Sequence, residues 1–378
     1  MLDLSAAFDT IDHTTLLHRL QDLYGITGKS LGWISSYLSD RQQTVCIDGT
    51  KSRPVVMHFG VPQGSVLGPI FYTMYTKPVG SICRYHGLDH HFYADDSQLY
   101  LSFKPMDKAS QAETLHRIER CLHDIVSWMH SNMLKLNTDK TEVIVFASGR
   151  NANLIRNISV TVGDSKINPS ASVRNLGVML DSKMDMEQQV NSVSRSCYAQ
   201  LRQIGHIRKY LTTDATKSLV NTRVTSRLDY CNALLVGVPK TVLGKLQRVQ
   251  NTAARLVCRS PRYDHITPRL RELHWLPVQY RTKYKILTYT YKALHDECPV
   301  YIKRLLEVYK PARNLRSTKQ SVTLVVPKSR TVTYGDRCFR SIAPKLWNAL
   351  PKHVRDCRTL CAFKKSLKTH FFHQAFQD

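Results

Sequence analysis

Two adjacent carboxylates stand between runs of aromatic and β-favouring residues in the segment HHFYADDSQLY, residues 90–100. Aspartate is depleted in strands, and neighbouring anions repel each other, so Asp95 and Asp96 need a reason to be there. One reason is a hairpin turn, because aspartate tolerates unusual turn backbones. The other is a metal site, because divalent cations bind several oxygen ligands.

A third acid, Asp3, ends the apolar run MLDL, which predicts a buried strand. If that strand lies beside the hairpin, three carboxylates meet, and bound cations would offset their repulsion. Two cations about 4 Å apart can clamp the attacking and leaving oxygens of a phosphoryl displacement. From the spacing alone, the turn and the two-metal site are equal alternatives.

The elements that must position these residues alternate between helices and strands. Asp12 is expected to cap a helix, HTTLLHRLQDLY, that Gly25 closes. GKSLGWISSYLSD predicts a second helix, QTVCIDG and SRPVVMHFG a hairpin through DGTK, and TEVIVFA a strand. GVPQGSVLGPIFYTMYT begins as a loop and turns helical. One apolar stripe predicts a long helix: Ala112, Leu115, Ile118, Leu122, Ile125, Met129 and Met133. The expected fold is α+β, with an antiparallel sheet and helices on one of its faces.

The charge is distributed unevenly along the chain. It has 54 Lys+Arg and 29 Asp+Glu, a formal net charge of +25. Residues 1–190 hold 18 basic and 19 acidic residues, a net of −1, so residues 191–378 hold 36 and 10, a net of +26. This asymmetry favours a polyanionic partner, most simply nucleic acid. A solvated surface and an anionic membrane surface are the weaker alternatives, and no apolar run is long enough for a transmembrane helix.

The basic half has helical patterns with separate apolar and basic faces. Two apolar stripes are Val190, Val193, Cys197, Leu201, Ile204 and Val242, Leu246, Val249, Ala253, Leu256. Another face of the second helix carries Lys245, Arg248, Arg255 and Arg259. That face is expected to bind phosphates, although an ordinary surface helix would show the same pattern.

Five blocks along the chain carry a family resemblance. They are LDLSAAFDTIDH, GVPQGSVLGPIFYTMY, FYADDSQLY, LKLNTDKTEVIVF and VRNLGVMLDSKM, within residues 1 to about 186. In this order they resemble the reverse transcriptase of non-LTR (LINE-type) retrotransposons, nearest to jockey-like and chicken-repeat-like elements. The tail segments LDYCNALLVGVP, LQRVQNTAARLV, LHWLPVQYRTKYKIL and APKLWNALP also look like the end of such an element's second open reading frame.

The resemblance implies an RNA-directed DNA polymerase with a right-hand palm. Asp3 and Asp95 match the ligands of two Mg²⁺ or Mn²⁺ ions, Asp96 is the adjacent acid, and Lys140 matches a basic residue near the triphosphate. An exposed lysine at a strand end is the other interpretation of Lys140. Phe8 matches the ring that excludes a ribose 2′-hydroxyl, so a small residue there should admit ribonucleotides. The same ring could also simply pack in the core.

The resemblance assigns further residues and partners. Gln63 and Gly64 match contacts to the incoming nucleotide, and Gly60, Gly64 and Gly68 should allow close backbone approach. Leu176, Gly177 and Val178 match the primer-grip turn. The implied partners are an RNA template and DNA primer, held as an RNA–DNA duplex, and dNTPs, with no membrane. The family implies nuclear and cytoplasmic localisation, and oligomeric state is not indicated.

The expected domains are the palm (1–150), the primer-grip region (151–189), a helical thumb (190–265) and a basic, mostly helical C-terminal region (266–378). Because the chain starts just before Asp3, we expect the fingers to be largely absent and polymerisation to be poor. The alternative function is a non-catalytic, basic nucleic-acid-binding remnant of such an element. Cys357, Cys361, His370 and His373 have a loosely zinc-like spacing, but a surface helix is the better interpretation.

Overall fold

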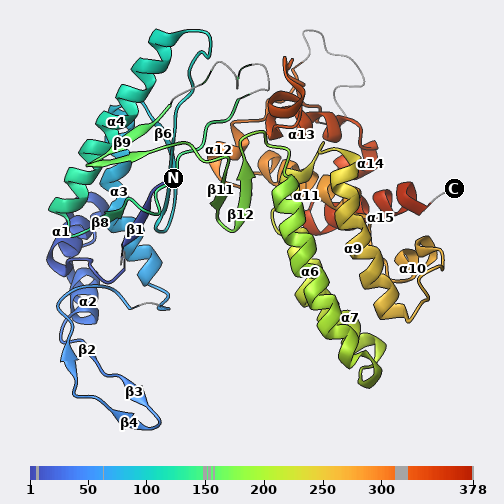
Figure 1. Cartoon of the computed structure of the whole chain (residues 1–378), viewed down its shortest axis with the longest axis horizontal. Helices are drawn as coiled ribbons and strands as arrows, with labels where there is room; N and C mark the ends of the chain where they lie inside the picture. Colours follow the sequence, from blue (N-terminus) through green and yellow to red (C-terminus); the bar gives the residue numbers. More distant parts are fainter. Residues whose placement is uncertain are drawn as a thin grey trace. The chain divides into compact units, whose positions relative to one another are not determined.

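The computed structural model describes residues 1–5, 8–62, 64–147, 151, 155, 158–310 and 322–376 of the chain. They form two compact units, Met1–Leu176 and Gly177–Asp378 (Figure 1). The finer sequence-based division at residues 150, 189 and 265 stays a prediction. Within the described residues, no helix is long and apolar enough to cross a membrane.

The first unit contains short strands that pair antiparallel, mostly in hairpins. They are β1 (Asp3–Ser5), β2 (Gln42–Gln43), β3 (Cys46–Ile47), β4 (Thr50–Lys51), β5 (Val55–Val56), β6 (Asp89–Tyr93), β7 (Asp96–Tyr100), β8 (Lys135–Asn137), β9 (Val160–Val162), β10 (Ser165–Ile167) and β11 (Ser172–Asn175). β1 pairs with β8, β2 with β5, β3 with β4, β6 with β7, and β9 with β10. The predicted hairpin at DGTK is confirmed, because Asp48 and Gly49 both have positive φ between β3 and β4.

Four helices accompany these strands: α1 (His13–Tyr24), α2 (Gly28–Leu38), α3 (Gly68–Tyr85) and α4 (Lys108–Ser131). The predicted limits of α1 are confirmed. The Asp12 carboxylate accepts a hydrogen bond from the Thr15 N–H at 2.6 Å, which satisfies a free donor of the first turn. Gly25 ends the helix with φ 65, a conformation that glycine adopts without strain.

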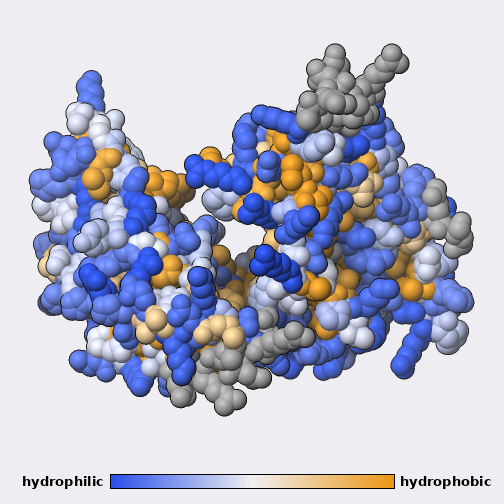
Figure 2. Space-filling view, turned by 90° about the horizontal axis from the view of Figure 1, so that it is seen from above, coloured by the Kyte–Doolittle hydropathy of each residue, from blue (hydrophilic) through white to orange (hydrophobic). Residues whose placement is uncertain are grey.

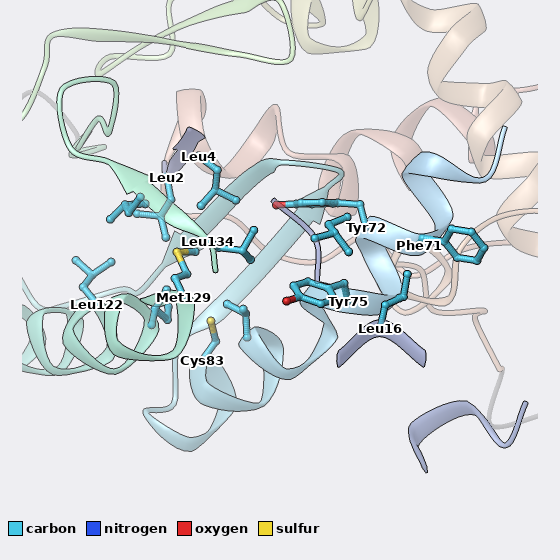
Figure 3. Close-up of a cluster of buried hydrophobic side chains, with 14 of the residues drawn as sticks. Leu2, Leu4, Leu16, Phe71, Tyr72, Tyr75, Cys83, Leu122, Met129 and Leu134 are labelled. Atoms are coloured by element: carbon cyan, nitrogen blue, oxygen red, sulfur yellow. The ribbon is translucent and has the colours of Figure 1, made fainter. Parts of the chain in front are cut away.

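The core of the first unit joins β1 to the helices. Leu2 and Leu4 are buried against side chains of α1, α3 and α4 (Figure 3). The α4 residues Leu122, Ile125 and Met129 are buried as the periodicity predicts.

Two local predictions are wrong. The stripe of α4 does not extend to its ends, because Ala112 is exposed and Met133, beyond the helix end at Ser131, is 63% exposed. TEVIVFA is not a strand, because Val143 forms only an isolated bridge with Pro169. The strand lies earlier, at β8, where β1 supplies a pairing partner. A run of apolar residues becomes a strand only where a neighbouring backbone is available to pair.

The second unit begins with β12 (Val178–Asp181) and is otherwise mostly helical, as predicted. Its longer helices are α6 (Glu187–Ile207), α7 (Thr213–Val220), α9 (Lys240–Cys258), α10 (Ile266–Glu272), α11 (Val278–Leu294), α13 (Phe339–Asn348) and α15 (Leu360–Phe376). Its short helical segments are η1 (Arg208–Tyr210), η2 (Asn221–Thr225), α8 (Ser226–Asp229), η3 (Asn232–Leu235), α12 (Val300–Lys303), η4 (Val332–Asp336) and α14 (Lys352–Arg355).

Helices α6 and α9 lie side by side in this unit (Figure 1). Both predicted apolar stripes face a common core, with Val190 and Cys197 from α6 against Leu246 and Val249 from α9. A second core gathers residues of α11, α13 and α15, including Tyr291, Trp347 and Phe363. The face in Figure 2 is mainly hydrophilic, with hydrophobic residues in separate groups. The mixture of helices and small antiparallel sheets agrees with the α+β class, whereas the names palm and thumb stay predictions.

Candidate active site

The adjacent acids lie where β6 turns into β7. Tyr93 pairs with Asp96, so Ala94 and Asp95 form the two-residue turn between them. Ala94 has φ 52, which is strained for a residue with a side chain. The turn interpretation is therefore correct for Asp95, and Asp96 is the first residue of β7. A turn at this place does not exclude a metal site, because the same turn can present both carboxylates to a neighbouring strand.

That neighbouring strand is β1. Leu2 and Ser97 form an antiparallel bridge, in which the Leu2 N–H donates to the Ser97 carbonyl at 2.8 Å and the Ser97 N–H to the Leu2 carbonyl at 3.4 Å. This bridge is isolated, and Asp3 and Asp96 are the next residues along the two strands. Their backbones therefore lie close together. On its other side, Asp3 pairs with Asn137 of β8.

The carboxylates of Asp3, Asp95 and Asp96, called here the acidic row, influence one another. The pKa of Asp96 is raised from its ordinary value of 3.8 by partial burial, by the charge of Asp95 and by the charge of Asp3. Three like charges on adjacent backbone positions are the electrostatic condition that a bound cation would relieve.

The described residues do not form a complete set of metal ligands. Among the described residues, no three His, Cys, Asp or Glu side chains are grouped so that they could hold a metal ion. The Leu2–Ser97 bridge and the mutual effect of the three charges agree with the predicted convergence of Asp3, Asp95 and Asp96. The geometry of these residues as metal ligands stays a prediction. The zinc interpretation of Cys357, Cys361, His370 and His373 gains no support, and the last three lie on α15.

Lys140 lies close to this row. Its ammonium Nζ is 3.9 Å from the Asp3 Oδ2, although 71% of the side chain is exposed. The Lys140 N–H donates to the Asn137 Oδ1 at 3.3 Å, which fixes the turn that follows β8. Lys140 is thus an exposed lysine just after a strand and a neighbour of the acidic row at once.

Phe8 packs against an aromatic residue that the sequence analysis did not single out. The centroids of the Phe8 and Tyr72 rings are 4.9 Å apart and the rings are tilted by 38°. Tyr72 is 1% exposed, and the pKa of its hydroxyl is raised by burial and by the charge of Asp95. Figure 3 shows the Tyr72 hydroxyl turned toward Leu4 of β1. The only sequence signal for Tyr72 was its place in the helix that follows the glycine-rich loop, residues 60–68.

The glycine-rich loop approaches the segment that carries Phe8. The Gly60 N–H donates to the Ile11 carbonyl and the Val61 N–H to the Phe8 carbonyl, both at 2.8 Å. A Cβ on Gly60 would lie 2.8 Å from the Asp9 carbonyl oxygen, and one on Gly68 3.1 Å from that of Pro62. A Cβ at Gly64 would meet nothing within 4 Å. The role of the three glycines in close approach to a nucleotide stays a prediction. Gln63 lies outside the described residues.

The expected primer-grip residues form a tight turn. Leu176 and Gly177 have φ 46 and φ 79 and connect β11 to β12, which begins at Val178. Glycine accepts such a conformation, but a bulky leucine is strained in it. Backbone strain gathers at functional sites, and the role of this turn in holding a primer stays a prediction.

The four basic residues proposed for phosphate binding on α9 are not equally available. The Lys245 Nζ is 2.7 Å from the Glu187 Oε1, and the Arg255 Nη2 donates to the Asp264 carbonyl at 3.2 Å. Arg248 and Arg259 are exposed. Periodicity placed all four on one face. In the structure, Lys245 forms an ion pair with another helix, and Arg255 and Arg259 donate to backbone carbonyls.

The crowding of carboxylates predicts that Asp96→Asn stabilises the metal-free chain. Because the folded pKa of Asp96 is raised, the folded state holds this proton more tightly, and the free energy of unfolding falls as pH rises above 3.8. Removing the charge should add about 0.2–1 kcal/mol at neutral pH, the size of a like-charge cross-strand pair.

Urea unfolding in the presence of a chelator measures this difference. It should vanish below the ordinary aspartate pKa and shrink at high salt. Asp89→Asn, at the far end of the same hairpin, is the matched control and should show neither change. A destabilised Asp96→Asn chain at neutral pH would contradict the coupling.

Comparison with known proteins shows the family of the part of the chain that contains these residues. The sequence profile of the family described as reverse transcriptase (RNA-dependent DNA polymerase) matches residues 1–180, which include Asp3, the β6–β7 hairpin and Lys140. Residues 1–180 belong to the reverse transcriptase family. The reverse transcriptase motifs and the acidic row therefore fall in the same part of the chain.

Curated relatives extend the similarity into the second unit. The chain is 27% identical over 327 residues to a protein named "Probable RNA-directed DNA polymerase from transposon BS" of Drosophila melanogaster, which covers 84% of this chain and 34% of the relative. It is 25% identical over 271 residues to the "RNA-directed DNA polymerase from mobile element jockey" of Drosophila funebris, covering 69% and 28%. The predicted relationship to LINE-type reverse transcriptases is confirmed. The chain spans about a third of the length of these relatives.

Proposed function

We propose that this chain is the polymerase part of a non-LTR retrotransposon protein, which adds dNTPs to a primer 3′-hydroxyl along an RNA template. The observation that carries the proposal is the backbone bridge between Leu2 and Ser97, next to Asp3 and Asp96, within the part of the chain that belongs to the reverse transcriptase family. In this proposal residues 1–150 form the palm, residues 151–189 the primer-grip region and residues 190–265 the thumb.

Asp3, Asp95 and Asp96 would hold two Mg²⁺ or Mn²⁺ ions. Carboxylate oxygens are the ligands these ions prefer, and burial together with the charges of Asp95 and Asp3 raises the pKa of Asp96. Asp96 is exposed and Asp3 is 34% exposed, so their side chains can rotate toward a cation. When bound, the ions would stabilise the negative charge that develops on the transferred phosphate.

The remaining residues would bind and orient the substrates. Lys140 would turn from Asp3 to the triphosphate, since most of its side chain is exposed. Phe8, held by its contact with the buried Tyr72, would set a rigid ring under the sugar. Gln63, Gly64 and the turn at Leu176, Gly177 and Val178 would contact the nucleotide and the primer. The proposed partners are the RNA–DNA duplex and dNTPs, and the proposed localisation is the nucleus and cytoplasm.

Direct measurement of Mn²⁺ binding tests the metal site. Electron paramagnetic resonance of free Mn²⁺ would be recorded with the wild-type chain, Asp3→Asn and the control Asp89→Asn. Loss of one charged ligand should weaken binding at least about tenfold, equal to about 1.4 kcal/mol, and only in Asp3→Asn.

Equal Mn²⁺ binding by wild type and Asp3→Asn would remove Asp3 from the proposed site. Binding of an RNA–DNA duplex without metal-dependent DNA synthesis would favour the other candidate, a non-catalytic nucleic-acid-binding protein. The net charge of +26 in residues 191–378 is the observation behind that candidate. A steep loss of affinity with salt is expected in both cases.

A further inference from the structure

Two tyrosines of the second unit are unusually exposed. Tyr210 is 77% and Tyr263 88% exposed, and no other large hydrophobic side chain described in this unit is as exposed as either. Tyr210 ends η1, directly after α6, and Tyr263 lies in the loop between α9 and α10. Single exposed rings are common on proteins, so a binding role for these two tyrosines depends on the residues that surround them.

Hydrogen bonds hold the two segments together at one end of the unit. The buried guanidinium of Arg208 donates to the carbonyls of Leu211, Leu256 and Val257 at 2.8–2.9 Å. Arg259 reaches from the end of α9 to the Leu211 carbonyl at 3.4 Å. Figure 1 shows α6 and α9 ending on the same side of this unit, beside α7 and α10. The backbone that carries Tyr210 is therefore fixed next to the backbone that leads to Tyr263.

Basic residues flank the two tyrosines in the sequence and have no acidic partners among the described residues. Lys209, Arg259 and Arg262 are exposed, and within the described residues none of them forms an ion pair with a carboxylate. The nearby acids Asp264 and Glu272 both pair with Arg269, at 3.8 and 3.2 Å. The pKa of Arg208 is lowered by burial and by the charge of Arg259. The Lys209 Nζ lies 4.8 Å from the centre of the Tyr210 ring.

We propose that this surface, formed by Lys209, Tyr210, Arg259, Arg262 and Tyr263, binds single-stranded RNA. Exposed rings next to cations suit unpaired nucleotides, because bases stack on the rings while phosphates meet the cations. A duplex offers its phosphates but keeps its bases stacked inside, so it would use the cations alone. The choice of RNA rests on the proposed function, in which the template is RNA. The surface would hold an unpaired stretch of that template.

The test is fluorescence anisotropy with the full chain and a labelled oligouridine, which has little structure of its own. The buffer contains no dNTPs and no divalent cation, so the result is independent of the catalytic proposal. Tyr210→Ala with Tyr263→Ala should weaken binding by about 5- to 150-fold for each ring removed. Affinity for a fully paired RNA duplex should not change. The thermal midpoint should stay the same, because both rings are exposed.

The charges should show themselves in the salt dependence. Lys209→Gln with Arg262→Gln should reduce the slope of log K against log salt concentration by about 1.4, as expected for two phosphate contacts on a single strand. The tyrosine variant should leave that slope unchanged. Tyr301→Ala with Tyr309→Ala, which removes two other exposed tyrosines of the same unit, is the matched control.

Three results would overturn the proposal. One is unchanged oligouridine affinity in the tyrosine variant, and another is an equal loss for single-stranded and duplex RNA. The third is tighter binding of oligothymidine than of oligouridine, which would assign the surface to single-stranded DNA. If Asp95→Asn, described below, abolishes DNA synthesis but leaves oligouridine binding intact, the proposed RNA-binding surface still holds.

Discussion

Asp95→Asn should lower RNA-templated DNA synthesis by this chain about a thousandfold or more. The change keeps the shape of the side chain but removes one of the charges that would hold the cations. Stabilisation of transition-state charge by a metal is worth several kcal/mol, and about 4 kcal/mol corresponds to three powers of ten in rate. The measurement is single-turnover incorporation of dTTP on a poly(rA)–oligo(dT) duplex with Mg²⁺ or Mn²⁺, relative to the wild-type chain.

Asp89→Asn is the control for this experiment. Asp89 lies at the other end of the same hairpin, paired with Tyr100, and is also exposed. It should keep the wild-type rate. Asp95→Asn should fold at least as stably as wild type, since it removes a repelling charge. Synthesis at the wild-type rate by Asp95→Asn would show that the carboxylate has no part in catalysis.

Gly60→Ala should destabilise the first unit by about 2–5 kcal/mol. Gly60 has φ 85, and an alanine Cβ would lie 2.8–3.0 Å from three backbone atoms of Asp9. The left-handed backbone costs a residue with a side chain about 1–2 kcal/mol, and overpacking adds about 1–3 kcal/mol. The Asp9 backbone cannot move aside cheaply, because flanking hydrogen bonds from Gly60 to Ile11 and from Val61 to Phe8 fix it.

Gly64→Ala separates these two contributions. Gly64 has φ 80 but open space around its Cα, so its replacement should cost only the backbone strain. Urea unfolding of both variants should therefore differ by about 1–3 kcal/mol. Equal destabilisation would mean that the contact with Asp9 relaxes without cost, and that the conformation alone makes glycine necessary at residue 60.

Local sequence signals predicted the elements of this protein well where the physical cause is itself local. Asp12 caps α1 because its side chain reaches an N–H three residues away, and Gly25 closes the helix because only glycine takes φ 65 without strain. The buried stripes of α6 and α9 follow from helical periodicity. TEVIVFA failed for the opposite reason, because strand formation depends on a partner distant in the sequence.

The order of motifs in the sequence by itself determined the family and named Asp3, Asp95, Asp96 and Lys140 as a set. Only the tertiary structure decided that Leu2, next to Asp3, bridges to Ser97, next to Asp96, and that Lys140 comes within 3.9 Å of Asp3. It also showed that Tyr72 packs against Phe8 and that Lys245 forms an ion pair with Glu187. Each of these depends on pairing register or side-chain packing between segments dozens of residues apart, and no periodicity within one segment encodes such contacts.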